Sequence, residues 1–242
     1  MQRFFFDDEK IIENKFTVVG QKHNHIVKVL RMSVGEHAVF CDGRGTDFEC
    51  ELLSCDKQSA EFLVVKDYPN QTEPQLKITV FQCLPKGEKM DEMVKRSVQF
   101  GAFNIVPVLS KRCVSRPDNK TMQKKVERLN KIALSSAMQS MRGIVPRVED
   151  AVDFKTALSM LNDFDNSYIC YEDEHGFLVN EADFSGKTVA ILIGPEGGID
   201  ESEIALAKEQ GIKCVSLGKR ILRTEDAAPF AIPIILFATN NL

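Results

Sequence analysis

The sequence predicts an α/β fold in which a small all-β module precedes a larger domain built on a parallel sheet. From about residue 75 onward, short apolar runs alternate with helical patterns, which is typical of a parallel sheet covered on both faces. Before that point the apolar runs are short and separated by turn residues. A polar, proline-bearing stretch over residues 68–74 lies between the two regions, so we expect domains over residues 1–70 and 75–242.

In the first module, strands are expected over residues 38–41, 48–52 and 60–65, with residues 42–45 as the hairpin turn between the first two. Three consecutive phenylalanines at residues 4–6 suit either core packing or stacking on nucleic acid bases. We expect at least one of them in the core.

Beyond the linker, each apolar run of strand length is followed by a segment with helical character. Residues 200–211 show this best, because Asp200 and Glu203 have the spacing of a capping box and Gly211 suits a helix stop. The predicted strands cover residues 78–84, 104–109, 168–171, 189–193 and 214–217. The predicted helices cover residues 89–100, 120–141, 154–161, 201–210 and 227–238.

The composition is that of an ordinary globular protein, with 242 residues, 43% hydrophobic and 27% charged. The first nine residues turn acidic after the phenylalanines and do not form a signal peptide, and no apolar stretch reaches membrane-spanning length. We therefore expect a cytoplasmic protein without membrane contact. The seven cysteines are scattered and lack a Cys-x-x-Cys pair, so they are expected as reduced thiols, several in the core, with no disulfide frame and no metal site.

The basic charge is concentrated in the middle of the chain, although the net charge is −4. Residues 86–147 contain fourteen Lys and Arg against five Asp and Glu. Such a concentration is typical of a surface that binds phosphates, and a solvated helix face is the alternative. The N-terminal module adds a smaller basic cluster at residues 22–31. From these regions, and from the chain start for Arg3, we select as candidate nucleic-acid contacts Arg3, Lys22, Arg31, Arg112, Arg116 and Lys124.

Two glycine-marked loops follow predicted strands, at residues 194–198 and 218–226. In open α/β sheets the ends of such strands form the ligand crevice, and glycine allows close approach of the backbone. The chain has neither a dinucleotide fingerprint nor a P-loop, and the loops lie among apolar residues, which favours a ligand of adenosine size; a plain turn before a capped helix is the alternative. The candidate cofactor residues are Ile193, Gly194, Pro195, Glu196, Gly197, Gly198, Leu217, Gly218, Ile221 and Leu222.

The two loops, together with the run at residues 139–142 and Pro146, resemble the RsmE family of SPOUT methyltransferases over nearly the whole chain. The resemblance implies a PUA-like RNA-binding β-barrel, an α/β domain with a C-terminal trefoil knot, and a homodimer. It also implies methyl transfer from S-adenosylmethionine to N3 of a uridine in 16S ribosomal RNA, free or in the small ribosomal subunit. The chain departs from the family pattern at Asp226, where the family has Thr, and at residues 99–100, where the family has Glu-Leu.

Methyl transfer to N3 requires in-line placement, removal of the N3 proton and stabilisation of the uracil anion. Within the resemblance, Arg142 is the first candidate for anion stabilisation and Arg223 the second, with an ion pair to Glu225 as the structural alternative for Arg223. Glu225 is the candidate base, with Asp226 or water as alternatives. Two other functions stay open: a non-catalytic RNA-binding factor that retains the fold, and a ribose 2′-O methyltransferase of the same superfamily.

Overall fold

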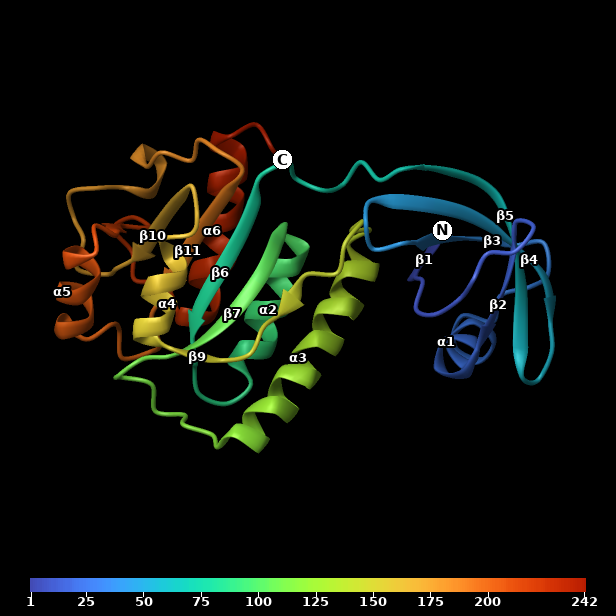
Figure 1. The fold of residues 1–242 in the computed structure, drawn as a ribbon, viewed down its shortest axis with the longest axis horizontal. Coiled ribbons are helices and arrows are strands. Elements are labelled where there is room, and N and C mark those ends of the chain that lie inside the picture. Colours follow the sequence, from blue (N-terminus) through green and yellow to red (C-terminus); the bar gives the residue numbers. More distant parts are fainter. The chain divides into compact units, whose positions relative to one another are not determined.

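Two compact units make up the computed structural model, which describes residues 1–242 (Figure 1). The N-terminal unit contains residues 1–73 and 137–145, and the C-terminal unit contains residues 74–136 and 146–242. The first boundary lies within the predicted linker. The segment 137–145 was expected in the second domain, but it belongs to the first, where Arg3 Nε donates a hydrogen bond of 2.8 Å to the Arg142 carbonyl.

A curled five-stranded sheet forms most of the N-terminal unit. Its strands follow the order β1-β3-β4-β5-β2, and only β1 and β3 are parallel. Their bounds are Gln2–Phe5 (β1), Lys15–Val19 (β2), His37–Cys41 (β3), Thr46–Cys55 (β4) and Ser59–Pro69 (β5). Helix α1 (Gly20–Asn24) and a π-helical turn (His25–Leu30) connect β2 to β3.

The two end strands of this sheet share one aromatic core. The ring centroid of Phe40 in β3 lies 5.1 Å from that of Phe4 in β1 and 4.8 Å from that of Phe16 in β2. The sheet must therefore curl, because strands at its two ends contact the same side chain. Phe4 and Phe5 are both buried, which confirms the core placement expected within residues 4–6.

The three strands and the hairpin turn predicted for this unit are confirmed by β3, β4 and β5. Strands β1 and β2 were not predicted.

A seven-stranded parallel sheet forms the centre of the C-terminal unit, with the order β12-β10-β11-β6-β7-β8 and β9 also paired with β7. The bounds are Lys77–Cys83 (β6), Ala102–Leu109 (β7), Arg147–Val148 (β8), Val152–Asp153 (β9), Asn166–Cys170 (β10), Thr188–Ile193 (β11) and Lys213–Val215 (β12). The parallel sheet and its five predicted strands are confirmed.

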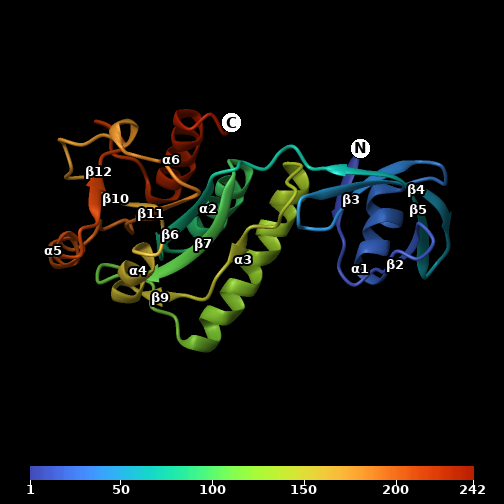
Figure 2. The same cartoon turned by 45° about the horizontal axis from the view of Figure 1, so that its top comes forward.

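Helices cover both faces of this sheet, as expected for parallel strands. Figure 2 shows α2 and α6 on one side of the strands and α4 on the other. The helices are α2 (Lys89–Gln99), α3 (Asn119–Gln139), α4 (Phe154–Leu161), α5 (Glu201–Glu209) and α6 (Thr224–Ala238), with a 3₁₀ turn at Val179–Glu181. Helix α6 begins three residues before its predicted start at 227, so Glu225 and Asp226 lie in its first turn.

The cysteines behave as core residues: six of the seven are buried and all are free thiols. Burial raises the pKa of Cys41 to about 11 and that of Cys50 to about 12, so these thiols stay protonated at neutral pH. None of the helices combines the length and apolar character needed to cross a membrane.

Candidate functional site

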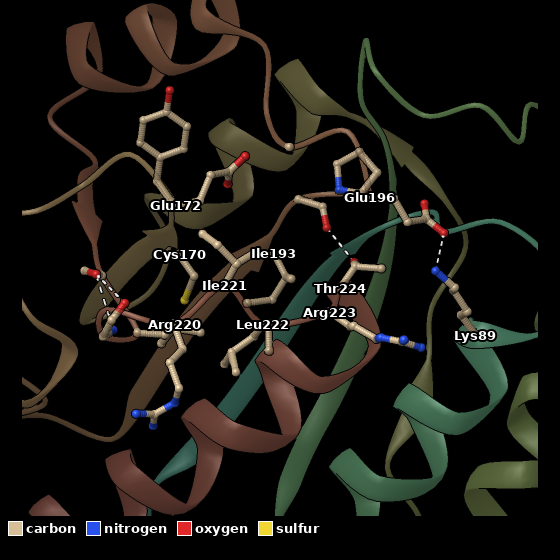
Figure 3. Close-up of a pocket in the computed structure, with 18 residues that line it drawn as sticks. Lys89, Cys170, Glu172, Ile193, Glu196, Arg220, Ile221, Leu222, Arg223 and Thr224 are labelled. Carbon is tan, nitrogen blue, oxygen red and sulfur yellow. Dashed lines mark hydrogen bonds and ion pairs between the residues drawn. The ribbon is translucent and has the colours of Figure 1, made fainter.

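A cavity of about 360 Å³ opens where three neighbouring strands of the C-terminal sheet end. It is lined by residues 170–172 at the end of β10, by residues 193–196 and 198 at the end of β11, and by residues 216–218 and 220–224 after β12, together with Lys89 from the start of α2 (Figure 3). The carboxyl ends of parallel strands are the usual ligand site of open α/β sheets, and this volume lies within the range of small-molecule sites.

Both predicted glycine loops reach this cavity, and buried hydrogen bonds hold them together. Thr224 Oγ1, at the start of α6, donates to the Gly194 carbonyl at 2.6 Å and accepts from Gln82 Nε2 at 2.9 Å. The predicted capping box is also confirmed at the start of α5. The Asp200 side chain accepts a hydrogen bond from the Glu203 backbone amide, and the Glu203 side chain accepts one from the Asp200 backbone amide. The loops are therefore anchored at their helix ends.

Nine of the ten predicted cofactor residues line the cavity. Apolar side chains form its middle part, where Ile193, Ile221 and Leu222 lie together in Figure 3. Gly197 is the exception: its carbonyl accepts a 3.1 Å hydrogen bond from Arg112 Nη1, and an added Cβ would face the Arg112 side chain at 3.6 Å. This glycine faces the loop after β7 rather than the cavity.

A cation between two carboxylates marks one side of the cavity. Lys89 Nζ lies 2.9 Å from Glu196 and 3.6 Å from Glu225. Partial burial acts to raise the pKa of Glu196, but hydrogen bonds from Lys89 and from the Lys86 amide outweigh it and hold that pKa below its usual value. In return, the hydrogen bond to Glu196 raises the pKa of Lys89. Both groups are therefore charged at neutral pH.

The predicted catalytic residues of the α6 region occupy three different settings. Arg223 lines the cavity. Glu225 is buried beside Lys89, its Oε2 has no hydrogen-bond partner, and it forms no ion pair with Arg223. Asp226 pairs with Arg96 of α2, so its carboxylate is already neutralised. Glu225 Oε2 is thus buried without a hydrogen bond, whereas Asp226 is held by Arg96.

Arg142, in contrast, lies in the N-terminal unit and is buried. Its guanidinium forms two hydrogen bonds with the Glu73 carboxylate, at 2.8 and 2.7 Å. Glu73 Oε1 also accepts from the amides of Gly143 and Ile144, at 2.7 and 3.2 Å. The pair therefore fixes the backbone of residues 142–144 and does not present the guanidinium at an open surface.

The candidate RNA contacts divide into engaged and exposed side chains. Arg3 is buried against Asp47, and Lys22 pairs with Asp7 and Glu9. The exposed ones are Arg31, Arg112, Arg116 and Lys124, of which Arg112 contacts Asp200 and Gly197, and Arg116 donates to the carbonyls of Ser110 and Lys111. Arg31 and Lys124 have no such partner.

Sequence reasoning missed three charged residues of the cavity, Lys89, Glu172 and Arg220, although Arg220 lies within the predicted loop at residues 218–226. Glu172 lies two residues after β10, so the rule that assigned the ends of β11 and β12 to a crevice could have included it. Lys89 opens α2, and no local motif marks that position.

The chain matches two families that act on RNA. The family described as "RNA methyltransferase domain" matches residues 72–236, and the one described as "RNA methyltransferase PUA domain" matches residues 20–65. The second match lies within the curled sheet and its two helical turns, and the first contains every residue that lines the cavity.

Known proteins resemble the chain over its full length. The ribosomal RNA small subunit methyltransferase E of Bacillus subtilis is 34% identical, with 100% of this chain and 98% of that protein covered. The protein of the same name from Mesomycoplasma hyopneumoniae is 31% identical, with 96% and 97% covered. The solved structure of the Neisseria gonorrhoeae ribosomal RNA small subunit methyltransferase E, bound to S-adenosyl methionine, has a TM-score of 0.89 and 28% identity, covering 98% and 97%.

Proposed function

We propose that this chain, which belongs to the RNA methyltransferase family, transfers a methyl group from S-adenosylmethionine to N3 of a uridine in small-subunit (16S) ribosomal RNA. The observation that carries the proposal is the cavity at the ends of β10, β11 and β12, formed by both glycine loops inside the matched family region. The N-terminal unit, with its match to a PUA domain, is the proposed RNA-docking module.

The residues around the cavity fit S-adenosylmethionine. Apolar Ile193, Ile221 and Leu222 suit an adenine ring, and the carboxylates that line the cavity suit hydroxyl donors and a cation. The cofactor, when bound, supplies an electrophilic methyl group on a sulfonium. The chain itself then has to orient the uracil, exclude water and take up one proton.

For the proton we propose Glu225. Its buried Oε2 has no hydrogen-bond partner and lies 3.6 Å from the Lys89 ammonium. Glu225 accepts the N3 proton as the N3 lone pair forms the bond to the methyl carbon and the bond from that carbon to sulfur breaks. Arg223, in the cavity lining, stabilises the uracil oxygen on which negative charge develops.

For Arg142 we propose a positioning role. Its bidentate pair with Glu73 and the two amides bound by the same carboxylate support a function in holding residues 142–144, which carry the family-like run. For contacts to RNA phosphates we propose the exposed Arg31, Arg112, Arg116 and Lys124. Arg3 and Lys22 stabilise the N-terminal unit through their carboxylate partners.

We also propose that the C-terminal region forms a trefoil knot and that the protein acts as a homodimer in the cytoplasm, where ribosomal subunits assemble. The strand order supports the knot, because the chain leaves β12 beyond β10 and must return past β10 to reach α6, which packs on β6 and β11. Exposed Phe230 and Phe237 on α6 support an apolar interface for the dimer.

The test is methylation of small-subunit ribosomal RNA with isotope-labelled S-adenosylmethionine, followed by nucleoside analysis by mass spectrometry. We expect label in 3-methyluridine, and at least a hundredfold lower single-turnover rate for Glu225→Gln. Label in a 2′-O-methylated nucleoside would replace the N3 assignment. Binding of RNA without any transfer would leave a non-catalytic RNA-binding factor.

A further inference from the structure

Two carboxylates, Glu172 and Glu196, line the cavity, a third, Glu225, lies beside it, and their surroundings differ. Glu196 accepts from Lys89 at 2.9 Å and from the Lys86 amide at 3.1 Å, and Glu225 lies 3.6 Å from the same lysine. Glu172, at the end of β10, lines the cavity without a hydrogen-bond or ion-pair partner. Figure 3 shows its side chain apart from the group of Lys89 and Glu196. Of the two carboxylates that line the cavity, Glu172 is the one without a protein partner.

The neighbouring glycine loop leaves room for this carboxylate. A Cβ atom at Gly198 would overlap Oε1 of Glu172, so a glycine at this position allows the carboxylate to lie against the loop. Gly198 also has a φ of +69°, in the left-handed region that favours glycine. The absence of a side chain at Gly198 therefore permits the observed position of the Glu172 carboxylate.

We propose that Glu172 is a cofactor-recognition residue that accepts hydrogen bonds from the ribose hydroxyls of S-adenosylmethionine. Glu172 lies two residues beyond β10, the strand that pairs with β11, and therefore lies next to the glycine loop. In dinucleotide-binding sheets a carboxylate near the glycine loop accepts from a ribose hydroxyl. The apolar side chains that suit adenine lie beside it in the same cavity. This inference rests on the proposed function, because it assumes that the cavity holds this cofactor.

Three ligands distinguish the ribose from the other hydrogen-bond donors and charges of the cofactor. S-adenosylmethionine has the ribose diol, the ammonium and the sulfonium; S-adenosylhomocysteine lacks the sulfonium; 5′-methylthioadenosine retains the diol and lacks both charges. Binding of each is measured by calorimetry for the wild-type protein, for Glu172→Ala, and for Asp173→Ala as a control that removes the same charge one residue away from the cavity lining.

We expect Glu172→Ala to weaken all three ligands by the same factor, about tenfold or more, because a charge-assisted hydrogen bond is lost in each case. Asp173→Ala should bind all three like the wild type. Weakening confined to the two amino-acid-bearing ligands would assign Glu172 to the ammonium, and weakening of S-adenosylmethionine alone would assign it to the sulfonium; either result overturns the ribose assignment. Unchanged affinities for Glu172→Ala, with normal wild-type binding, overturn the inference alone. A wild-type protein that binds none of the ligands overturns the proposed function.

The role of Gly198 is tested by combining the two positions. Gly198→Ala should displace the Glu172 carboxylate and weaken the three ligands about as much as Glu172→Ala does. In the Glu172→Ala background the same change should add little, because the displaced group is already absent. Thermal melting confirms that each variant is folded, and additive losses would show that Gly198 acts independently of Glu172. If Gly198→Ala does not fold, the comparison of Glu172→Ala with Asp173→Ala still decides the ribose assignment.

Discussion

Lys89 forms ion pairs with two carboxylates at the candidate site. Its Nζ lies 2.9 Å from Glu196 and 3.6 Å from Glu225. Its removal takes away the hydrogen bond from Lys89 that lowers the pKa of Glu196, so that pKa rises, and it takes away the cation that the two carboxylates share, so their side chains can move apart. The lysine therefore controls the position of the proposed base.

We expect Lys89→Met to lower the single-turnover methylation rate at pH 7 by at least tenfold and to raise the pKa of Glu196. The pKa is measured by NMR titration of the carboxyl carbon, and the rate with saturating RNA and cofactor. Lys95→Met, on the exposed side of the same helix, is the matched control. Equal rates for the two variants would contradict the role of Lys89.

For Arg142→Ala we expect a loss of about 3–5 kcal/mol in the free energy of unfolding, because the partly buried Glu73 carboxylate loses its buried cation. Urea denaturation measures it, with Lys124→Ala as an exposed basic control. The double variant Arg142→Ala/Glu73→Ala should recover part of the loss. A stable Arg142→Ala protein with a much reduced turnover would instead support direct action on the uracil.

Sequence alone gave the residues of the two glycine loops because their signals are local: a strand, a glycine and a capped helix follow one another in the chain. Burial of Arg142 was not accessible in this way. Its partner Glu73 lies in the linker region, and its second contact, Arg3, lies near the N-terminus, far from Arg142 in the chain. A motif identifies which residue matters, but the partners that decide its role come from the fold.

At the scale of elements, the loop after β7 supports the N-terminus of α5. Asp200 caps this helix, and its carboxylate contacts Lys111 Nζ at 2.8 Å and Arg112 Nε at 3.4 Å. The hydrogen bond from Lys111 is the main cause that lowers the pKa of Asp200 far below its usual value. Part of the basic charge seen in the sequence thus anchors the end of the GPEGG loop at residues 194–198.

The lowered pKa predicts a dependence of stability on pH. The stabilisation by ionised Asp200 is fully present above the unfolded-state pKa of about 3.9 and is lost as the pH falls through the lower folded-state value. Urea midpoints measured from neutral to strongly acidic pH should therefore fall more steeply for the wild type than for Asp200→Asn. Asp8→Asn, at an exposed site without a partner, should follow the wild type. Parallel curves for wild type and Asp200→Asn would contradict the prediction.

The strand order explains why the sequence revealed only part of the cavity. The chain runs β10, β11, β12, but in the sheet β10 lies between the other two. This arrangement places the end of β10, with Glu172, at the centre of the site, whereas along the chain residues 194–198 and 218–226 looked like the complete crevice. Local patterns predict the strands well, but not which strands become neighbours.

At the scale of the whole molecule, all residues that line the cavity belong to the C-terminal unit. We therefore expect a chain that lacks residues 1–70 to bind S-adenosylmethionine with unchanged affinity by calorimetry and to methylate ribosomal RNA at a sharply reduced rate. The truncation removes the unit to which the segment 137–145 belongs, so this segment becomes exposed. Gel filtration checks that the truncated chain does not aggregate. RNA methylation equal to that of the full chain would remove the docking role of the N-terminal unit.

The segment 137–145 has a consequence for the order of folding during synthesis. The chain passes from one unit to the other after residues 73, 136 and 145, so the N-terminal unit is not finished when its last strand has been translated. At about 5–20 residues per second, the ribosome needs roughly 4–15 seconds more to deliver Arg142 to Glu73. Throughout that interval Glu73 lacks the Arg142 guanidinium. The nascent N-terminal unit stays incomplete until the segment 137–145 emerges, after β6, α2 and β7.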